Sequence, residues 1–189
     1  TGDYGRFSRT LSHLAFKHAA AIFTISHSTK RYVQSWVSDP TRVHAIKLGV
    51  DVTRFSPGPS DLPSDIAPIL RGRTILLTVS RLVESKGIDT VIRAMPAIAA
   101  SVPDVIYVIV GDRPDRIRLE AMTRELKLED RVIFAGRRSG EELIQLYRTC
   151  RLFVLVSRFQ EGLGMAALEA AACEKPVVVG DRGGQPETV

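Results

Sequence analysis

The sequence lacks several features that would place the protein in a membrane or outside the cell. It has no apolar run of about 18 residues, the length that a membrane-spanning helix requires. Its N-terminal residues lack the basic-then-apolar order and the cleavage site of a signal peptide. It has only two cysteines, Cys150 and Cys173, without the spacing of metal ligands. These absences predict a cytoplasmic protein with reduced thiols.

Metal clusters and dinucleotide-binding fingerprints are also missing. All four histidines precede residue 56 and have no carboxylate at ligand spacing, so we expect no metal site. No G-x-G-x-x-G follows the strand expected at residues 74–79, which disfavours a dinucleotide oxidoreductase. There is no basic helix with interleaved aromatic residues, so nucleic acid is not expected as a partner.

The composition is that of a globular protein, with 44% hydrophobic and 25% charged residues. Its net charge of +5 is concentrated in residues 1–60, where eight Lys or Arg face three Asp, while residues 61–189 balance at 18 against 18. Two interpretations of this basic segment stay open. It is either a solvated surface or a surface for an anionic partner, such as the inner face of a membrane.

A proline-rich stretch, FSPGPSDLPSDIAPILRG, divides the sequence. It predicts a linker over residues 56–70 between a segment 1–55 and a domain 71–189. Before the linker we expect helices at 7–20 and near 29–37, the second capped by Ser26 or Ser28, and strands at 21–25 and 43–48.

Strands and helices alternate regularly after the linker. Strands are expected at 74–79, 105–110, 131–135, 152–156 and 176–179, and helices at 87–101, 115–128, 140–149 and 163–173. Strands that are apolar throughout predict a parallel sheet covered on both faces, hence an α/β, Rossmann-like domain. Ligands of such sheets bind beyond the carboxyl ends of the strands, so the loops at 80–87, 111–116, 136–140, 157–164 and 180–185 should form the site.

The first of these loops, SRLVESKG, contains two cations, Arg81 and Lys86. Arg offers a planar fork of donors and Lys a mobile point charge, so the two could clamp a diphosphate and stabilise its charge. The alternative is a pair of surface cations, one of them paired with Glu84.

The stretch EGLGMAALE places two glutamates eight positions apart, one in a glycine-flanked turn and one inside an alanine-rich helix. A helix that begins near Gly164 would present unpaired N–H groups and its positive dipole end to a phosphate. Glu161 lies before that helix and Glu169 about 7–8 Å along it, so the two could bracket a nucleotide-sugar. Glycoside hydrolysis is disfavoured because Glu169 is poorly placed to act on the same bond as Glu161. The loop GDRGG, after the last strand, is a weaker candidate for binding hydroxyls or phosphates.

These motifs together resemble one known family. SRLVESKG, EGLGMAALEAAACEKPVV, the pair Gly183–Gly184 followed by Pro186–Glu187, and AIKLGVDVTRFSP are similar to motifs of the retaining family 4 glycosyltransferases of the GT-B fold. The motifs EGLG and GDRGGQPE look closest to those of bacterial mannosyltransferases that act on lipid-type acceptors. Residues 1–55 would then be the end of the acceptor domain, and 71–189 the nucleotide-sugar-binding domain.

The resemblance implies a GDP- or UDP-sugar donor, retention at the anomeric carbon, no obligatory metal, and an acceptor such as a lipid-linked or polysaccharide precursor. The leaving phosphate would help to deprotonate the acceptor. Arg81 and Lys86 would hold the diphosphate, Glu169 the ribose, and the backbone near Arg137 the base. The transferred sugar and distal phosphate would be held by Glu161 and by the backbone of Gly162, Leu163, Gly164 and Met165. Arg81, Lys86 and Glu161 would therefore be the catalytic residues.

Three departures from the family pattern stand out. Ser80 replaces a glycine near the phosphates, and Glu174 replaces a glycine where a positive φ would strain a glutamate. Most of the acceptor domain and the end of the donor domain have no counterpart, so we expect a fragment of a longer enzyme. Two alternatives stay open. One is a module that binds a sugar nucleotide without catalysis. The other is a sugar-nucleotide epimerase of the same fold, which the Arg81–Lys86 loop and the spaced glutamates disfavour.

Overall fold

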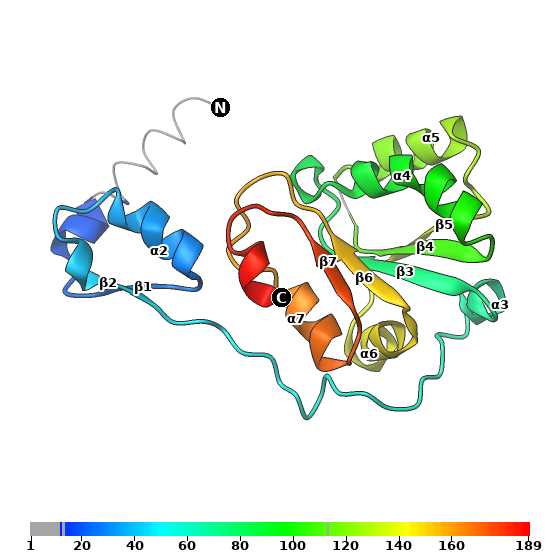
Figure 1. Cartoon of the computed structure of the whole chain (residues 1–189), viewed down its shortest axis with the longest axis horizontal. Helices are drawn as coiled ribbons and strands as arrows, with labels where there is room; N and C mark the ends of the chain where they lie inside the picture. Colours follow the sequence, from blue (N-terminus) through cyan, green and yellow to red (C-terminus); the bar gives the residue numbers. More distant parts are fainter. Residues whose placement is uncertain (1–11, 13, 113) are drawn as a thin grey trace. The chain divides into compact units, whose positions relative to one another are not determined.

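The structure, a computed structural model, describes residues 12, 14–112 and 114–189 and divides the chain into two compact units (Figure 1). The units are Thr1–Leu48 and Gly49–Val189. Of the helix expected at residues 7–20, residues 7–11 and 13 lie outside the described residues, and residues 14–18 are helical. Within the described ranges, no helix is both long and apolar enough to cross a membrane.

The first unit contains a parallel pair of short strands, β1 (Ile22–Thr24) and β2 (Val43–Ala45). They are connected by α2 (His27–Gln34) and the 3₁₀ turn η1 (Pro40–Arg42). The side chain of Ser26 accepts a hydrogen bond from the Thr29 N–H at 3.0 Å, which confirms the expected cap. The strand expected at 43–48 is shorter because β1, its partner, has only three residues to pair with it.

The proline-rich stretch lies in the second unit. Its one short helix is α3 (Ala67–Leu70). Phe55 is buried with its ring centroid 5.9 Å from that of Tyr147, and Arg148 Nε donates to the Ser56 carbonyl at 2.9 Å. Asp65 pairs with Arg138 at 2.5 Å. The stretch is therefore held by apolar and polar contacts despite its prolines.

The second unit is built on a five-stranded parallel sheet. Its strands are β3 (Thr74–Val79), β4 (Val105–Val110), β5 (Val132–Gly136), β6 (Leu152–Leu155) and β7 (Val177–Val179), in the order β5-β4-β3-β6-β7. Every residue of β4 is buried, as expected for a strand with both faces covered. The predicted parallel sheet is thus confirmed.

Helices cover both faces of this sheet (Figure 1). Leu76 and Tyr107 pack with residues of α4 (Ile88–Ser101) and α5 (Arg116–Glu125), whereas Ile75 and Leu77 pack with residues of α6 (Gly140–Thr149) and α7 (Met165–Ala172). Successive strand residues face opposite sides, so these two clusters are the two core layers. The fold is the predicted α/β, Rossmann-like one.

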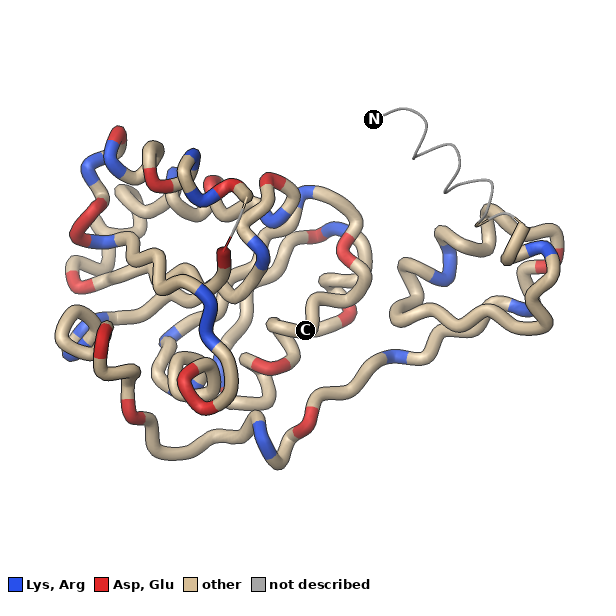
Figure 2. Tube along the Cα trace, turned by 180° about the vertical axis from the view of Figure 1, so that it is seen from behind, with Lys and Arg blue, Asp and Glu red and all other residues tan. Residues whose placement is uncertain are grey.

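The strand order reverses beside β3, with β4 and β5 on one side and β6 and β7 on the other. In open α/β sheets, ligands bind outside the carboxyl ends of the strands at such a reversal. Figure 2 shows both signs of charge distributed along the second unit, in keeping with the 18 Lys or Arg and 18 Asp or Glu of residues 61–189. Any attraction of the site for anions must therefore come from the residues at this edge.

Candidate functional site

The loop after β3 is held against the end of β6. Its last residues form the 3₁₀ turn η2 (Glu84–Lys86), and Gly87 then adopts a left-handed conformation with φ 67°. A Cβ on Gly87 would lie 2.1 Å from the Val156 carbonyl oxygen. Glycine is therefore required there by both the backbone conformation and the close approach. This contact places Lys86 beside the loop that follows β6.

Lys86 and Glu161 are in direct contact. Lys86 Nζ donates to Glu161 Oε2, and the Ser157 hydroxyl lies 3.0 Å from the same carboxylate oxygen. The side chains of Lys86 and Glu161 are only 15% and 21% exposed, so their attraction is screened less than at an open surface. The structure therefore brings together two of the three residues expected to be catalytic.

The loop after β7 supports the backbone of Glu161. Gly183 has φ 62°, and a Cβ on it would lie 2.4 Å from the Glu161 carbonyl oxygen. The Gly184 N–H donates to that oxygen at 2.8 Å. The N–H groups of this loop were expected to be weaker candidates for binding hydroxyls or phosphates. One of them, that of Gly184, holds the loop that carries Glu161.

Glu169 lies on α7, as expected. The helix begins at Met165, and its N-cap Gly164 has φ 93° and makes no side-chain capping bond. Glu169 Oε2 accepts a hydrogen bond from the Tyr147 hydroxyl at 2.7 Å. Burial and the negative charge of Glu169 raise the pKa of Tyr147, so the phenol stays protonated and remains a donor.

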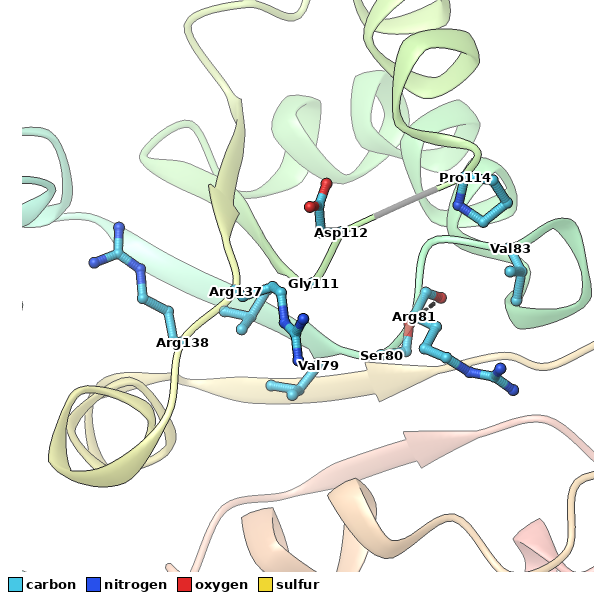
Figure 3. Close-up of a pocket in the computed structure, with 10 residues that line it drawn as sticks. Val79, Ser80, Arg81, Val83, Gly111, Asp112, Pro114, Arg137 and Arg138 are labelled. Atoms are coloured by element: carbon cyan, nitrogen blue, oxygen red, sulfur yellow. Dashed lines mark hydrogen bonds between the residues drawn. The ribbon is translucent and has the colours of Figure 1, made fainter.

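A pocket of about 710 Å³ lies at the carboxyl edge of β3, β4 and β5 (Figure 3). Arg81 lines it from the loop after β3, and Arg137 and Arg138 line it from the loop after β5. Both Arg81 and Arg137 are exposed, and neither forms a salt bridge with a residue that the structure describes. Ser80 also lines the pocket, where its hydroxyl donates to the Arg81 carbonyl at 3.2 Å. The pocket therefore presents two unpaired cations.

Arg138 has a structural role. Its guanidinium pairs with Asp65 and Glu142 and donates to the Ala135 carbonyl at 2.9 Å. The hydrogen bond to Asp65 raises the pKa of Arg138 and lowers that of Asp65. This arginine thus attaches the proline-rich stretch to the loop after β5.

The expected site residues fall into three places. Arg81 and Arg137 line the pocket, Lys86 and Glu161 form an ion pair, and Glu169 contacts Tyr147. Neither Lys86 nor the two glutamates are among the residues that line the pocket.

The sequence interpretation missed Asp89 and Arg158. Arg158 Nη2 lies 2.6 Å from Asp89 Oδ2 and 3.0 Å from the Thr90 hydroxyl. The backbone N–H of Arg158 donates to the Ser85 carbonyl at 2.8 Å. It thereby connects the loop that carries Glu161 to the turn that carries Lys86. A carboxylate in the first turn of a helix is common, so nothing in the sequence indicated this partner.

The two cysteines are unsuited to nucleophilic chemistry. Both are buried, and burial raises the pKa of the Cys150 thiol to about 12. The thiolate, which is the reactive form, is therefore disfavoured at neutral pH. Among the described residues, no three His, Cys, Asp or Glu side chains gather as a metal-binding group. The site offers cations and carboxylates instead.

The chain is similar to a known protein family and to several of its members. The family described as "Glycosyl transferases group 1" matches residues 64–189. A GDP-mannose-dependent alpha-(1-6)-phosphatidylinositol monomannoside mannosyltransferase from Mycolicibacterium smegmatis is 33% identical over 190 residues, covering 96% of this chain and 50% of the relative. A D-inositol 3-phosphate glycosyltransferase from Mycobacterium sp. (strain JLS) is 33% identical, covering 80% of this chain and 35% of the relative.

Solved structures show the same likeness. A crystal structure of Anabaena HepE in complex with UDP and glucose matches with a TM-score of 0.84 and 28% identity, covering 96% of this chain and 50% of that one. Sucrose-phosphate synthase from Thermosynechococcus elongatus matches with a TM-score of 0.79 and 28% identity, covering 95% and 45%. The chain spans about half of the length of the mannosyltransferase and of HepE.

Proposed function

The chain belongs to the glycosyl transferases group 1 family, and we propose that it carries the donor-binding half of a retaining glycosyltransferase. The enzyme transfers a hexose, mannose being the first candidate, from a nucleotide-diphosphate sugar to an acceptor. The observation that carries this proposal is the contact between Lys86 and Glu161, which joins the loops after β3 and β6, two strands that pair in the sheet. The same loop after β3 brings Arg81 to the pocket.

The cations of the loop after β3 suit the diphosphate. Arg81 is exposed in the pocket without a carboxylate partner, so its guanidinium is available for phosphate oxygens. Lys86, five residues further on, adds a second positive charge on the side of β6. Two cations supplied by the loop after β3 stabilise the charge that develops on the leaving diphosphate, a task that a metal ion performs in other sites.

The carboxylates suit the two sugars of the donor. Glu161, before α7, binds hydroxyls of the transferred sugar, and the backbone of residues 162–165 meets that sugar and the distal phosphate. Glu169, on α7, binds the ribose hydroxyls. The backbone near Arg137, at the other end of the pocket, meets the base. The leaving phosphate accepts the acceptor's proton, so no protein base is assigned.

The M. smegmatis relative is named for a phosphatidylinositol monomannoside substrate and for GDP-mannose. By that likeness we assign a lipid-linked acceptor, reached at the inner face of a membrane, with the basic residues of the first unit near the anionic surface. A second candidate function is donor binding without transfer. It is favoured by the placement of all the proposed donor contacts in the second unit alone.

Calorimetric titration of the chain with GDP-mannose and with UDP-glucose tests donor binding. Arg81→Ala and Glu169→Ala should abolish the binding seen with the preferred donor. Arg151→Ala is the matched control, because it removes an exposed arginine from the start of β6, at the opposite edge of the sheet. Thermal unfolding gives a second readout, since a ligand at 100 times its Kd should add about 2.7 kcal/mol of stability.

The outcomes separate the candidates. Equal binding by Arg81→Ala, Glu169→Ala and Arg151→Ala would overturn the proposed donor site. Binding without sugar transfer by a full-length protein would support the second candidate. Transfer with inversion, seen as the anomeric configuration of the product by NMR, would reject the retaining mechanism.

A further inference from the structure

Tyr147 is a fully buried residue of α6 whose hydroxyl contacts the proposed donor site. Its ring packs between Phe55 and Phe153, with a centroid separation of 5.9 Å from each. The hydroxyl donates to Glu169 Oε2 at 2.7 Å, across from α6 to α7. A ring held on two sides by other rings cannot move its hydroxyl without disturbing the core. The phenol is thus a fixed donor.

This hydrogen bond restricts the orientation of the Glu169 carboxylate. Oε2 is engaged by a buried partner, while Oε1 accepts no hydrogen bond from a residue that the structure describes. Glu169 is half-buried, so its side chain is within reach of a ligand at the surface. A glutamate held at one oxygen loses rotational freedom before the ligand arrives, which lowers the entropy cost of binding. The carboxylate is preorganised.

We propose that Tyr147 is a positioning residue that orients Glu169 toward the vicinal hydroxyls of the donor's ribose and thereby makes the site selective for ribonucleotides over 2′-deoxyribonucleotides. The inference rests on the proposed function, which assigns the ribose to Glu169. A site built to hydrogen-bond a hydroxyl discriminates against an analogue without it, since its own polar group is left unpaired. The discrimination is sharpest when the carboxylate cannot rotate away to find water.

The chain supplies a matched control in Tyr107. This tyrosine is also fully buried, on β4, and its hydroxyl donates to the Thr78 hydroxyl at 2.8 Å. Tyr147→Phe and Tyr107→Phe each remove one buried hydroxyl and keep the ring in the core. They differ in whether the lost bond ends on Glu169. A purely structural role for Tyr147 would make the two variants behave alike.

The experiment is calorimetric titration of the whole chain with GDP, UDP and their 2′-deoxy counterparts. We expect the parent to prefer the ribonucleotide of its base. Tyr147→Phe should weaken ribonucleotide binding by about tenfold, the loss expected for a hydrogen bond to a charged group. It should leave 2′-deoxyribonucleotide binding unchanged. Tyr107→Phe should keep the parent's affinities and its preference. Adding Tyr147→Phe to Glu169→Gln should cause no further loss, because the two residues act through one bond.

Failure of the inference and failure of the proposed function give different results. If Tyr147→Phe keeps the parent's ribose preference while Glu169→Gln loses it, Tyr147 has no positioning role and the donor site stands. If Glu169→Gln also keeps the parent's affinity and preference, the ribose does not bind at Glu169, and both the assignment and the inference are overturned.

Discussion

Glu174 has a left-handed backbone conformation, with φ 58°, just after α7 ends at Ala172. Helices commonly end on such a residue, and it is usually glycine because a side chain is strained there. The family resemblance predicted this strain, since Glu174 stands where a glycine is usual. The structure confirms it. Two backbone hydrogen bonds hold this conformation. The Glu174 N–H donates to the Ala171 carbonyl at 2.9 Å, and the Lys175 N–H donates to the Ala170 carbonyl at 3.1 Å.

Glu174→Gly should therefore stabilise the protein. The relieved left-handed strain is worth ~1–2 kcal/mol, and the greater freedom of glycine in the unfolded chain offsets ~0.5–1 kcal/mol of it. We expect a net gain of ~0.5–1 kcal/mol in the free energy of unfolding, measured with urea. Glu174→Ala is the control, because alanine removes the charge and keeps the strain. An equal gain from alanine would mean that charge, not backbone conformation, explains the effect.

Single residues of the site were partly predictable from the sequence. The residue types predicted a site for a diphosphate and sugar hydroxyls at Arg81, Lys86, Glu161 and Glu169. Their contacts could not be foreseen, because Lys86 and Glu161 are 75 positions apart and meet only when β3 and β6 pair. The fixed phenol of Tyr147 was hidden for the same reason, 22 positions from Glu169.

At the scale of the elements, the loop after β6 is fastened to the start of α4 by one side chain. Asp89 is 8% exposed, and its Oδ2 lies 2.6 Å from Arg158 Nη2, which is also within 3.0 Å of the Thr90 hydroxyl. Asp89 Oδ1 has no hydrogen-bond partner among the described residues. Two arginines compensate this buried carboxylate, Arg158 at 2.6 Å and, more distantly, Arg118 at 3.9 Å.

Arg158→Ala should destabilise the protein and weaken donor binding together. Leaving Asp89 buried with its charge poorly compensated should reduce the free energy of unfolding by ~2 kcal/mol. The loop would also lose its side-chain attachment near Lys86, so the Kd for the preferred donor should rise. Adding Asp89→Asn should recover part of the stability, because the buried charge is gone. Simple additivity of the two changes in urea unfolding would contradict the proposed coupling.

Helices and strands of the second unit were predictable where the pattern is long. The bounds of β3, β4 and α6 agree with those predicted, because a strand that is apolar throughout and an amphipathic helix leave few alternatives. The ends of shorter elements are set by geometry that no pattern contains. For example, α7 was expected from residue 163 but begins at Met165, since Gly164 has φ 93° and Leu163 is buried outside the helix.

At the scale of the whole molecule, the chain divides after Leu48. Prolines predicted a linker over residues 56–70, because proline disrupts helices and strands. Three apolar side chains explain why the segment nevertheless joins the second unit. Phe55, Ile66 and Leu70 are buried in the same core layer as Tyr147. Isolated apolar residues in an irregular stretch have no periodicity, so the sequence could not reveal this packing.

Phe55→Ala should consequently destabilise the second unit. Deleting a buried phenylalanine typically costs about 3–5 kcal/mol, part of it for the cavity left behind. Trp36, the one tryptophan of the sequence, lies in the first unit, so its fluorescence reports on that unit, whereas circular dichroism is dominated by the larger one. We expect the dichroism transition in urea to shift and the fluorescence transition to stay. A common shift in both would show that the two units unfold together.

The contact between Lys86 and Glu161 has a consequence for how the proposed donor is recognised. The two half-buried charges satisfy each other when no donor is bound. In the proposed function, phosphate oxygens would replace Glu161 as the ionic partner of Lys86. The free energy gained on binding would then be only the difference between the phosphate–lysine and glutamate–lysine attractions. That exchange would also free Glu161 for the hydroxyls of the sugar. Recognition of the sugar would then depend on the diphosphate, because a free hexose cannot compete for the lysine and would find the glutamate already paired.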